Sequence, residues 1–116
     1  MEFKVSFKKE YILTKIFGPQ PNEVQSFFKI IDQINSQIQE LYTVKPCNIV
    51  FDLSHINFID SYLISALVRA YQISILNKHA ILITDENILS IIELVGLDQL
   101  FQIYKSKADF DENFLK

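Results

Sequence analysis

The sequence has few of the residues that cross-link a chain or let it turn sharply. Its 116 residues include one cysteine, two glycines, three prolines and no tryptophan. With so few glycines, neither G-x-G-x-x-G nor a Walker A loop can be written. The lone cysteine, Cys47, excludes an intrachain disulfide, and we expect an inert, reduced thiol there. Two histidines and scattered acids show no metal-ligand spacing. The composition therefore predicts neither a metal nor a cofactor.

Long apolar runs and an excess of basic charge are also missing. No segment approaches the roughly 20 uninterrupted apolar residues of a membrane span, and residues 1–5 lack the apolar core of a signal peptide. The formal charge of −3 and the isoelectric point near 5.3 give no electrostatic footprint for nucleic acid. We therefore expect a cytoplasmic protein with no membrane span and no nucleic-acid partner.

The chain does have ample material for one hydrophobic core. Apolar residues make up 49% of it, including ten Phe and five Tyr. The length is typical of one domain. We therefore expect a single domain over residues 1–116.

The first third of the chain predicts a hairpin and a long helix. Residues 3–7 alternate apolar and polar side chains, and residues 11–17 form a second strand-like run. The Gly18-Pro19-Gln20-Pro21 segment then ends the strand. A helix is expected to start near Asn22, a suitable N-cap, with Glu23 in its first turn. Its predicted apolar stripe is Val24, Phe27, Phe28, Ile31, Ile34, Ile38 and Leu41.

The remaining two thirds alternate strands with helices. Strands are predicted at 49–53, 80–84 and 100–104, and helices at 61–77, 85–95 and 109–115. Asp85 can cap the second of these helices, and Gly96 suits its left-handed C-terminal position. The order is ββαβαβα with a βα tail. It predicts an α/β fold with a mixed, mostly parallel sheet of four to five strands, an N-terminal hairpin and three to four packed helices.

The most informative stretch joins the strand at 49–53 to the helix at 61–77. It ends in Asp60-Ser61, which places a hydroxyl beside a carboxylate where a helix begins. The unpaired N–H groups and the helix dipole make the potential positive there, so Ser61 is a good place to add and remove a phosphate. Ser54 lies two positions after Asp52, but a serine that leaves a strand usually bonds to its own turn. His55 has no orienting acid, which argues against a catalytic base.

One face of the helix at 61–77 is polar. Leu63, Ala66, Leu67 and Ala70 make an apolar stripe, and the opposite face consists of Ser61, Tyr62, Ser65, Arg69 and Gln72. Such a face is either a solvated outer surface or a recognition surface, because Tyr and Arg are enriched where proteins bind one another. Periodicity alone leaves both interpretations open. His79, in the following loop, is predicted at the surface.

Two motifs resemble the STAS domain family of bacterial anti-sigma factor antagonists. The first is Phe51-Asp52-Leu53-Ser54 followed by Phe58-Ile59-Asp60-Ser61, an apolar strand, a turn and an Asp-Ser step into a helix. The second, residues 91–104, resembles that family's Gly-Leu and apolar-Phe stretch near the C-terminus. With the ββαβαβα order, the resemblance covers nearly the whole chain.

The resemblance implies partner switching rather than catalysis. In such proteins the unphosphorylated domain binds a cognate kinase of the histidine-kinase-like ATPase type, which is also the anti-sigma factor, and so frees the sigma factor. The kinase phosphorylates the serine of the Asp-Ser step, and the phosphorylated domain then releases the kinase. Any nucleotide then comes from this kinase, and a serine phosphatase would complete the cycle. Carried over, Ser61 is the phosphoacceptor, and Asp60, Ser61, Tyr62, Ser65 and Arg69 contact the partner.

Two alternatives remain open. Tyr62 and Leu63 replace the small residue and glycine that usually follow the Asp-Ser step, and they are closer to variants of the family that build stressosome-like scaffolds. A scaffold, or a soluble subunit of a membrane transport complex, would not be regulated at Ser61. A small hydrolase or transferase would need a pocket with convergent polar groups, and the sequence supplies none that can be identified.

Overall fold

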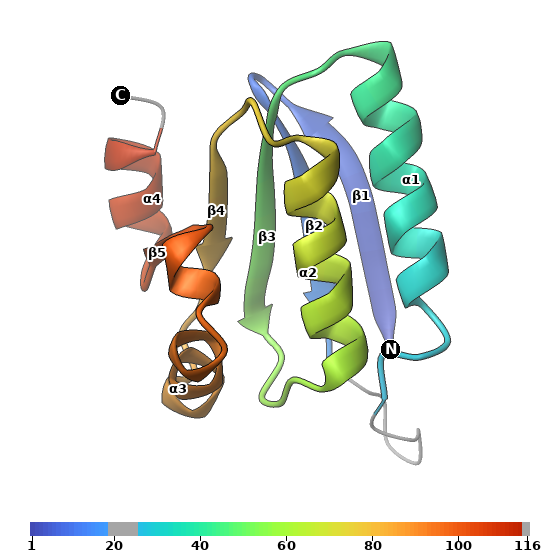
Figure 1. Ribbon diagram of the computed structural model, residues 1–116. Helices are drawn as coiled ribbons and strands as arrows, with labels where there is room; N and C mark the ends of the chain where they lie inside the picture. Colours follow the sequence, from blue (N-terminus) through green and yellow to red (C-terminus); the bar gives the residue numbers. More distant parts are fainter. Residues whose placement is uncertain (19–25, 115–116) are drawn as a thin grey trace.

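The computed structural model describes residues 1–18 and 26–114 as a layered α/β fold (Figure 1). Within these residues the strands and helices follow the predicted order, with a short 3₁₀ helix, η1, added. They are β1 (Glu2–Lys8), β2 (Tyr11–Phe17), α1 (Ile31–Val44), β3 (Asn48–His55), α2 (Ser61–Ile73), β4 (His79–Leu82), α3 (Glu86–Leu94), η1 (Leu97–Gln99), β5 (Gln102–Tyr104) and α4 (Lys107–Asn113).

The strands form one mixed sheet in the order β1-β2-β3-β4-β5. β1 and β2 pair antiparallel as a hairpin, and every other neighbouring pair is parallel. This confirms the predicted fold class, including the N-terminal hairpin. Parallel neighbours need crossover connections, which α1, α2 and α3 provide.

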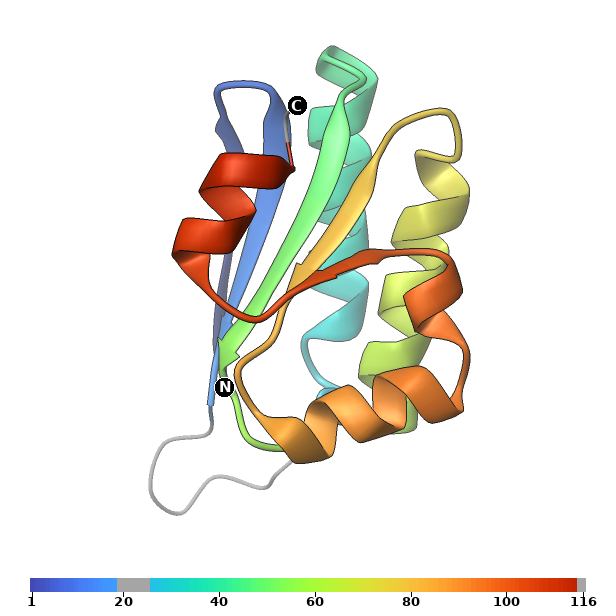
Figure 2. The same ribbon diagram turned by 90° about the vertical axis from the view of Figure 1, so that its left-hand side faces the viewer.

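Alternate strand residues point to opposite faces, so the sheet has a core on each side. The larger core lies beneath α1, α2 and α3 and includes Ile12, Phe51 and Leu67. The smaller core lies beneath α4 and joins Val50 and Leu82 to the α4 side chains Phe110 and Phe114. Figure 2 shows α4 on one side of the sheet and α1 and α2 on the other.

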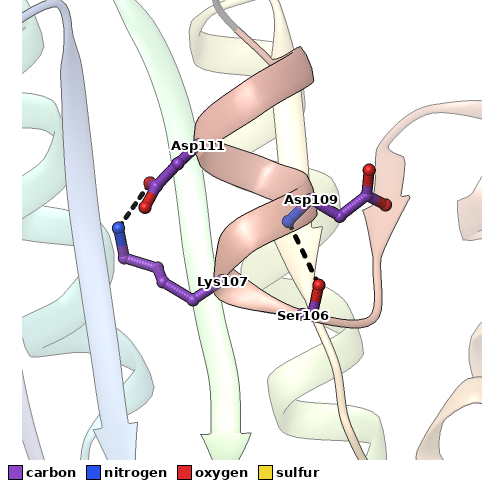
Figure 3. Close-up of polar contacts among 4 residues, drawn as sticks. All are labelled: Ser106, Lys107, Asp109 and Asp111. Carbon is purple, nitrogen blue, oxygen red and sulfur yellow. Dashed lines mark hydrogen bonds and ion pairs between the residues drawn. The ribbon is translucent and has the colours of Figure 1, made fainter.

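Local capping signals place several helix ends as predicted. The Asp85 side chain accepts hydrogen bonds from the N–H groups of Asn87 and Ile88 at the start of α3. Gly96 follows α3 with φ +81°, a conformation that only glycine adopts without strain. Ser106 caps α4 through the Asp109 N–H (Figure 3), so α4 begins at Lys107 rather than at the predicted Asp109.

The first long helix begins later than predicted. Asn22, Glu23 and Val24 lie outside the described residues, and α1 begins at Ile31. The backbone N–H of Phe27 donates to Asp60 Oδ2 at 3.0 Å, whereas a helix would direct it to a carbonyl one turn back. This long-range bond therefore holds the segment as a turn. It leaves Phe28, predicted on the buried stripe, 60% exposed.

The connection from α2 to β4 also differs from the prediction. α2 ends at Ile73 instead of near Asn77, and Ser74 turns the chain with its hydroxyl donating to the Ala70 carbonyl. His79, predicted at the surface, is 5% exposed. Its Nε2 lies 2.9 Å from both the carbonyl oxygen and the hydroxyl of Ser74. Because a carbonyl only accepts, that nitrogen carries the proton. Burial lowers the pKa of His79.

Cys47 lies at the end of the α1–β3 connection and is buried. Burial raises the pKa of its thiol, which disfavours the reactive thiolate.

Candidate functional site

Ser61 is the first residue of α2, at the end of the loop that follows β3. Its side chain is exposed, and its hydroxyl makes no hydrogen bond with any residue that the structure describes. The helix behind it runs for 13 residues, so its dipole and free N–H groups are directed at this position. The hydroxyl is open to a modifying enzyme.

Asp60 uses both carboxylate oxygens, and they reach in different directions. Oδ1 accepts from the N–H of Leu63 at 3.1 Å, which is the N-cap bond of α2. Oδ2 accepts from the N–H of Phe27 at 3.0 Å, 33 residues away along the chain. The carboxylate therefore fastens the segment before α1 to the start of α2.

Aromatic side chains frame this junction. The Phe27 ring packs against Phe58 at a centroid distance of 5.0 Å, and Phe28 packs against Tyr62 at the same distance. Phe27 is buried, whereas Phe28 and Tyr62 are 60% and 41% exposed. Ser61 thus adjoins an exposed aromatic pair contributed by two segments far apart in sequence.

The exposed face of α2 is as expected from its periodicity. Leu63, Ala66, Leu67 and Ala70 are fully buried, and the exposed side chains of the opposite face are Ser61, Tyr62, Ser65, Arg69 and Gln72. α1 extends this face, because Arg69 lines a shallow hollow with the α1 residues Asp32, Asn35, Ser36 and Gln39. Figure 1 shows α1 and α2 side by side. The surface therefore spans two helices.

Sequence reasoning missed Phe28 and the α1 residues of this surface. The apolar spacing of Phe28 placed it in a helix core, and no local signal shows that Asp60 holds it in a turn. The polar positions of α1 were visible as the complement of its apolar stripe. What joins them to Arg69 is the packing of α1 against α2, which no local pattern contains.

The other residues that the sequence singled out have local roles. The Ser54 hydroxyl donates to Asp52 Oδ1 at 2.5 Å, and its N–H donates to the same oxygen at 3.0 Å. His55 ends β3, and its ring stacks on Phe17 at 5.1 Å. Residues 1–18 and 26–114 contain no group of three side chains that could hold a metal ion. Across the same ranges, no helix is long and apolar enough to cross a bilayer.

Comparison with known proteins agrees with this arrangement. Residues 23–110 match the STAS domain family. The chain belongs to that family. Both motifs quoted from the sequence lie in the matched range, one joining β3 to α2 and the other running from α3 to β5. The sequence matches no curated protein.

Solved structures resemble this STAS domain along most of its length. An anti-sigma factor antagonist from Mycobacterium paratuberculosis shares 19% identity with a TM-score of 0.71, covering 93% of this chain and 88% of that one. A STAS domain protein from Planctomyces limnophilus shares 14% with a TM-score of 0.69, covering 92% of each chain. The phosphorylated form of SpoIIAA, a Bacillus cell fate determinant, shares 12% with a TM-score of 0.65, covering 96% and 98%. At these identities the likeness concerns the fold.

Proposed function

We propose that this STAS domain, as a single unit of residues 1–116, acts in the cytoplasm as an anti-sigma factor antagonist-like binding module. Its partner is a serine kinase of the histidine-kinase-like ATPase type that is also the anti-sigma factor, and phosphorylation of Ser61 releases that partner. The observation that carries the proposal is the exposed, unbonded Ser61 hydroxyl at the start of α2. In its support, the structural relatives include an anti-sigma factor antagonist and a phosphorylated protein.

The hydrogen bonds of Asp60 bear on what a phosphate at Ser61 would do. Two N–H donors at this junction, those of Leu63 and Phe27, are already bound to the Asp60 carboxylate. A phosphate carries roughly −1.5 to −2 charges, and the helix dipole offsets only about 0.3–1 kcal/mol at an exposed site. The neighbouring carboxylate opposes even that gain. The added charge therefore stays at the surface, and the fold does not need to change.

A docked partner would experience this charge directly. An uncompensated like-charge contact in an interface costs several kcal/mol. A loss of about 2.8 kcal/mol already weakens binding about a hundredfold. We assign the partner contacts to Asp60, Ser61, Tyr62, Ser65 and Arg69, all on or next to the exposed face of α2. One modification at the edge of this surface then suffices to release the partner. The domain itself performs no catalysis in this scheme, in keeping with its family.

The proposal is tested with the purified kinase and ATP. We expect a mass gain of one phosphate that maps to Ser61 and is absent in Ser61→Ala. Ser61→Ala keeps partner binding and blocks release, whereas Ser61→Asp weakens binding. Ser90→Asp on α3 is the matched control, because it adds the same charge at an exposed site on another helix. Phosphate at another residue, or equal affinity of Ser61→Ala and Ser61→Asp, would refute it.

A second function is favoured by the aromatic pair next to Ser61. Phe28 and Tyr62 expose apolar surface that phosphorylation does not remove, and Leu63 packs inward. A scaffold of the stressosome type, or a transport-complex subunit, would use such a surface for a permanent contact. In that case Phe28→Ser and Tyr62→Ser abolish assembly in sedimentation velocity, and Ser61→Asp leaves it unchanged.

A further inference from the structure

The sheet face opposite α1 and α2 is only partly covered. α4 packs over β3, β4 and β5, with Tyr11 and Leu13 of β2 at the margin of its core. β1 and β2 direct further side chains to this face, next to α4. In strand order they include Lys4, Ser6 and Lys8 from β1 and Leu13 and Lys15 from β2.

Two adjoining hollows lie on this face, one at the edge of α4 and the other over β1 and β2. One has a volume of about 270 Å³, with an apolar floor that includes Val50, Leu82 and Phe110. The other has a volume of about 240 Å³ and extends over β1 and β2 to Phe17. They share Lys8, Leu13 and Lys15. Together they make one groove, apolar beneath and lined with amines, which we call the lysine groove.

The charge in the lysine groove is opposite to that of the chain. Lys4, Lys8, Lys15 and Lys107 line it. The carboxylates are Asp52 in its wall and Asp111, which pairs with Lys107 (Figure 3). The protein as a whole carries −3. Glu2, two positions before Lys4, adds a third carboxylate on the same face beyond the groove. Four cations against three anions, in a net-negative protein, make this face a local attractor for anions.

The strand register places two of these amines next to each other. Lys4 of β1 lies directly opposite Lys15 of β2. Like charges at directly opposed positions destabilise an antiparallel pair. Lys15 also neighbours Asp52 in the register, but neither Lys4 nor Lys15 forms a salt bridge with any described residue. A bound anion between the two amines would turn this repulsion into attraction.

We propose that the lysine groove binds a small organic acid with an apolar body. Its carboxylate lies at the Lys4–Lys15 pair, and its apolar part packs on Leu13, Tyr11 and Phe110. The larger hollow alone has the volume of about nine water molecules, which suits a short aliphatic or aromatic chain. This site is on the sheet face opposite α2, so it does not depend on phosphorylation of Ser61.

The test is an amide NMR titration of the whole protein with sodium octanoate, using 1-octanol as the neutral ligand of equal chain length. Because octanoate has few non-hydrogen atoms, we expect it to bind with a Kd of about 1–10 mM. We expect saturable shifts in residues 4–8, 11–15, 50–52 and 107–110, and binding of octanol at least about fivefold weaker. Absence of saturation, shifts confined to α1 and α2, or equal binding of octanol would overturn the proposal.

Charge variants locate the carboxylate. Lys15→Gln and Lys4→Gln should each weaken octanoate binding about three- to tenfold, and each leaves octanol binding unchanged. Lys45→Gln, at an exposed site after α1 and outside both hollows, is the control with the same change in net charge. Lys4 is exposed, so its variant folds even if Lys15→Gln does not. Equal octanoate affinity of Lys4→Gln and Lys45→Gln would refute the assignment.

Discussion

Replacing Asp60 should destabilise the fold far more than replacing an ordinary helix cap. Asp60→Ala removes the N-cap bond to Leu63, worth about 0.5–2 kcal/mol. It also leaves the N–H of Phe27 without its acceptor, which costs about 1–3 kcal/mol for a group shielded from water. The two losses share one side chain and do not simply add. We expect the free energy of unfolding to fall by about 2–4 kcal/mol.

Two further variants separate the local bond from the long-range one. Asp60→Asn keeps one side-chain oxygen, and its amide nitrogen, which cannot accept, faces the other N–H donor. One hydrogen bond is lost, and the free energy of unfolding should fall by about 1–2 kcal/mol. Asp85→Ala removes a cap whose bonds, to Asn87 and Ile88, are purely local. It should cost only about 0.5–2 kcal/mol. The excess loss in Asp60→Ala measures the tie to Phe27.

The assay is equilibrium unfolding in urea, monitored by circular dichroism. An m value that is the same in all variants checks that the mutations leave the folded and unfolded states alike. The Phe27 amide resonance should shift in Asp60→Asn and stay in place in Asp85→Ala. If Asp60→Ala is no more destabilising than Asp85→Ala, the carboxylate does not fasten the two segments together. In that case the late start of α1 needs another cause.

The other predictions concern His79, the cross-strand lysines and Arg69. Burial lowers the pKa of folded His79 below its ordinary value of 6.5. Between about pH 7 and pH 5, the unfolded chain therefore binds more protons at this residue than the folded protein does. The free energy of unfolding should drop over that range, and His79→Gln should flatten the drop; an unchanged slope would contradict this. Lys4→Glu should raise the free energy of unfolding in urea by about 0.2–1 kcal/mol, because it turns the repulsion with Lys15 into attraction. A decrease would show that Lys4 and Lys15 do not lie opposite each other. Arg69→Glu should impair partner binding in calorimetry and leave the thermal midpoint nearly unchanged, because its side chain is exposed; a large drop in midpoint would show that Arg69 is structural.

Local signals account for the parts of the fold that were predicted well. The strand at Tyr11–Phe17 matches its apolar run, Asp85 caps α3, and Gly96 takes a positive φ. Each depends on residues within a few positions of one another. The exposed face of α2 was also predicted from a local signal, because helical periodicity alone separates Ser65 and Arg69 from the buried stripe.

The failures share a different cause. Phe28 has the spacing of a core residue, yet it is exposed because Asp60, 32 positions away in the printed sequence, holds its neighbour Phe27 in a turn. His79 has the composition of a loop around it, yet Ser74 and the rings of Tyr71 and Phe101 enclose it. In both cases a side chain from a distant segment, Asp60 for Phe27 and Phe101 for His79, contributes what the local pattern does not contain.

The amino-acid sequence by itself determined the order of strands and helices and the position of Ser61 at the start of a helix, because periodicity and capping act within one or two turns. Its two motifs indicated the family by resemblance. Only the tertiary structure decided that Asp60 joins two distant segments and that α1 and α2 share one surface. It alone brings Lys4, Lys15 and Lys107 to one groove. These are consequences of strand register and helix packing, which arise from the whole chain folding on itself.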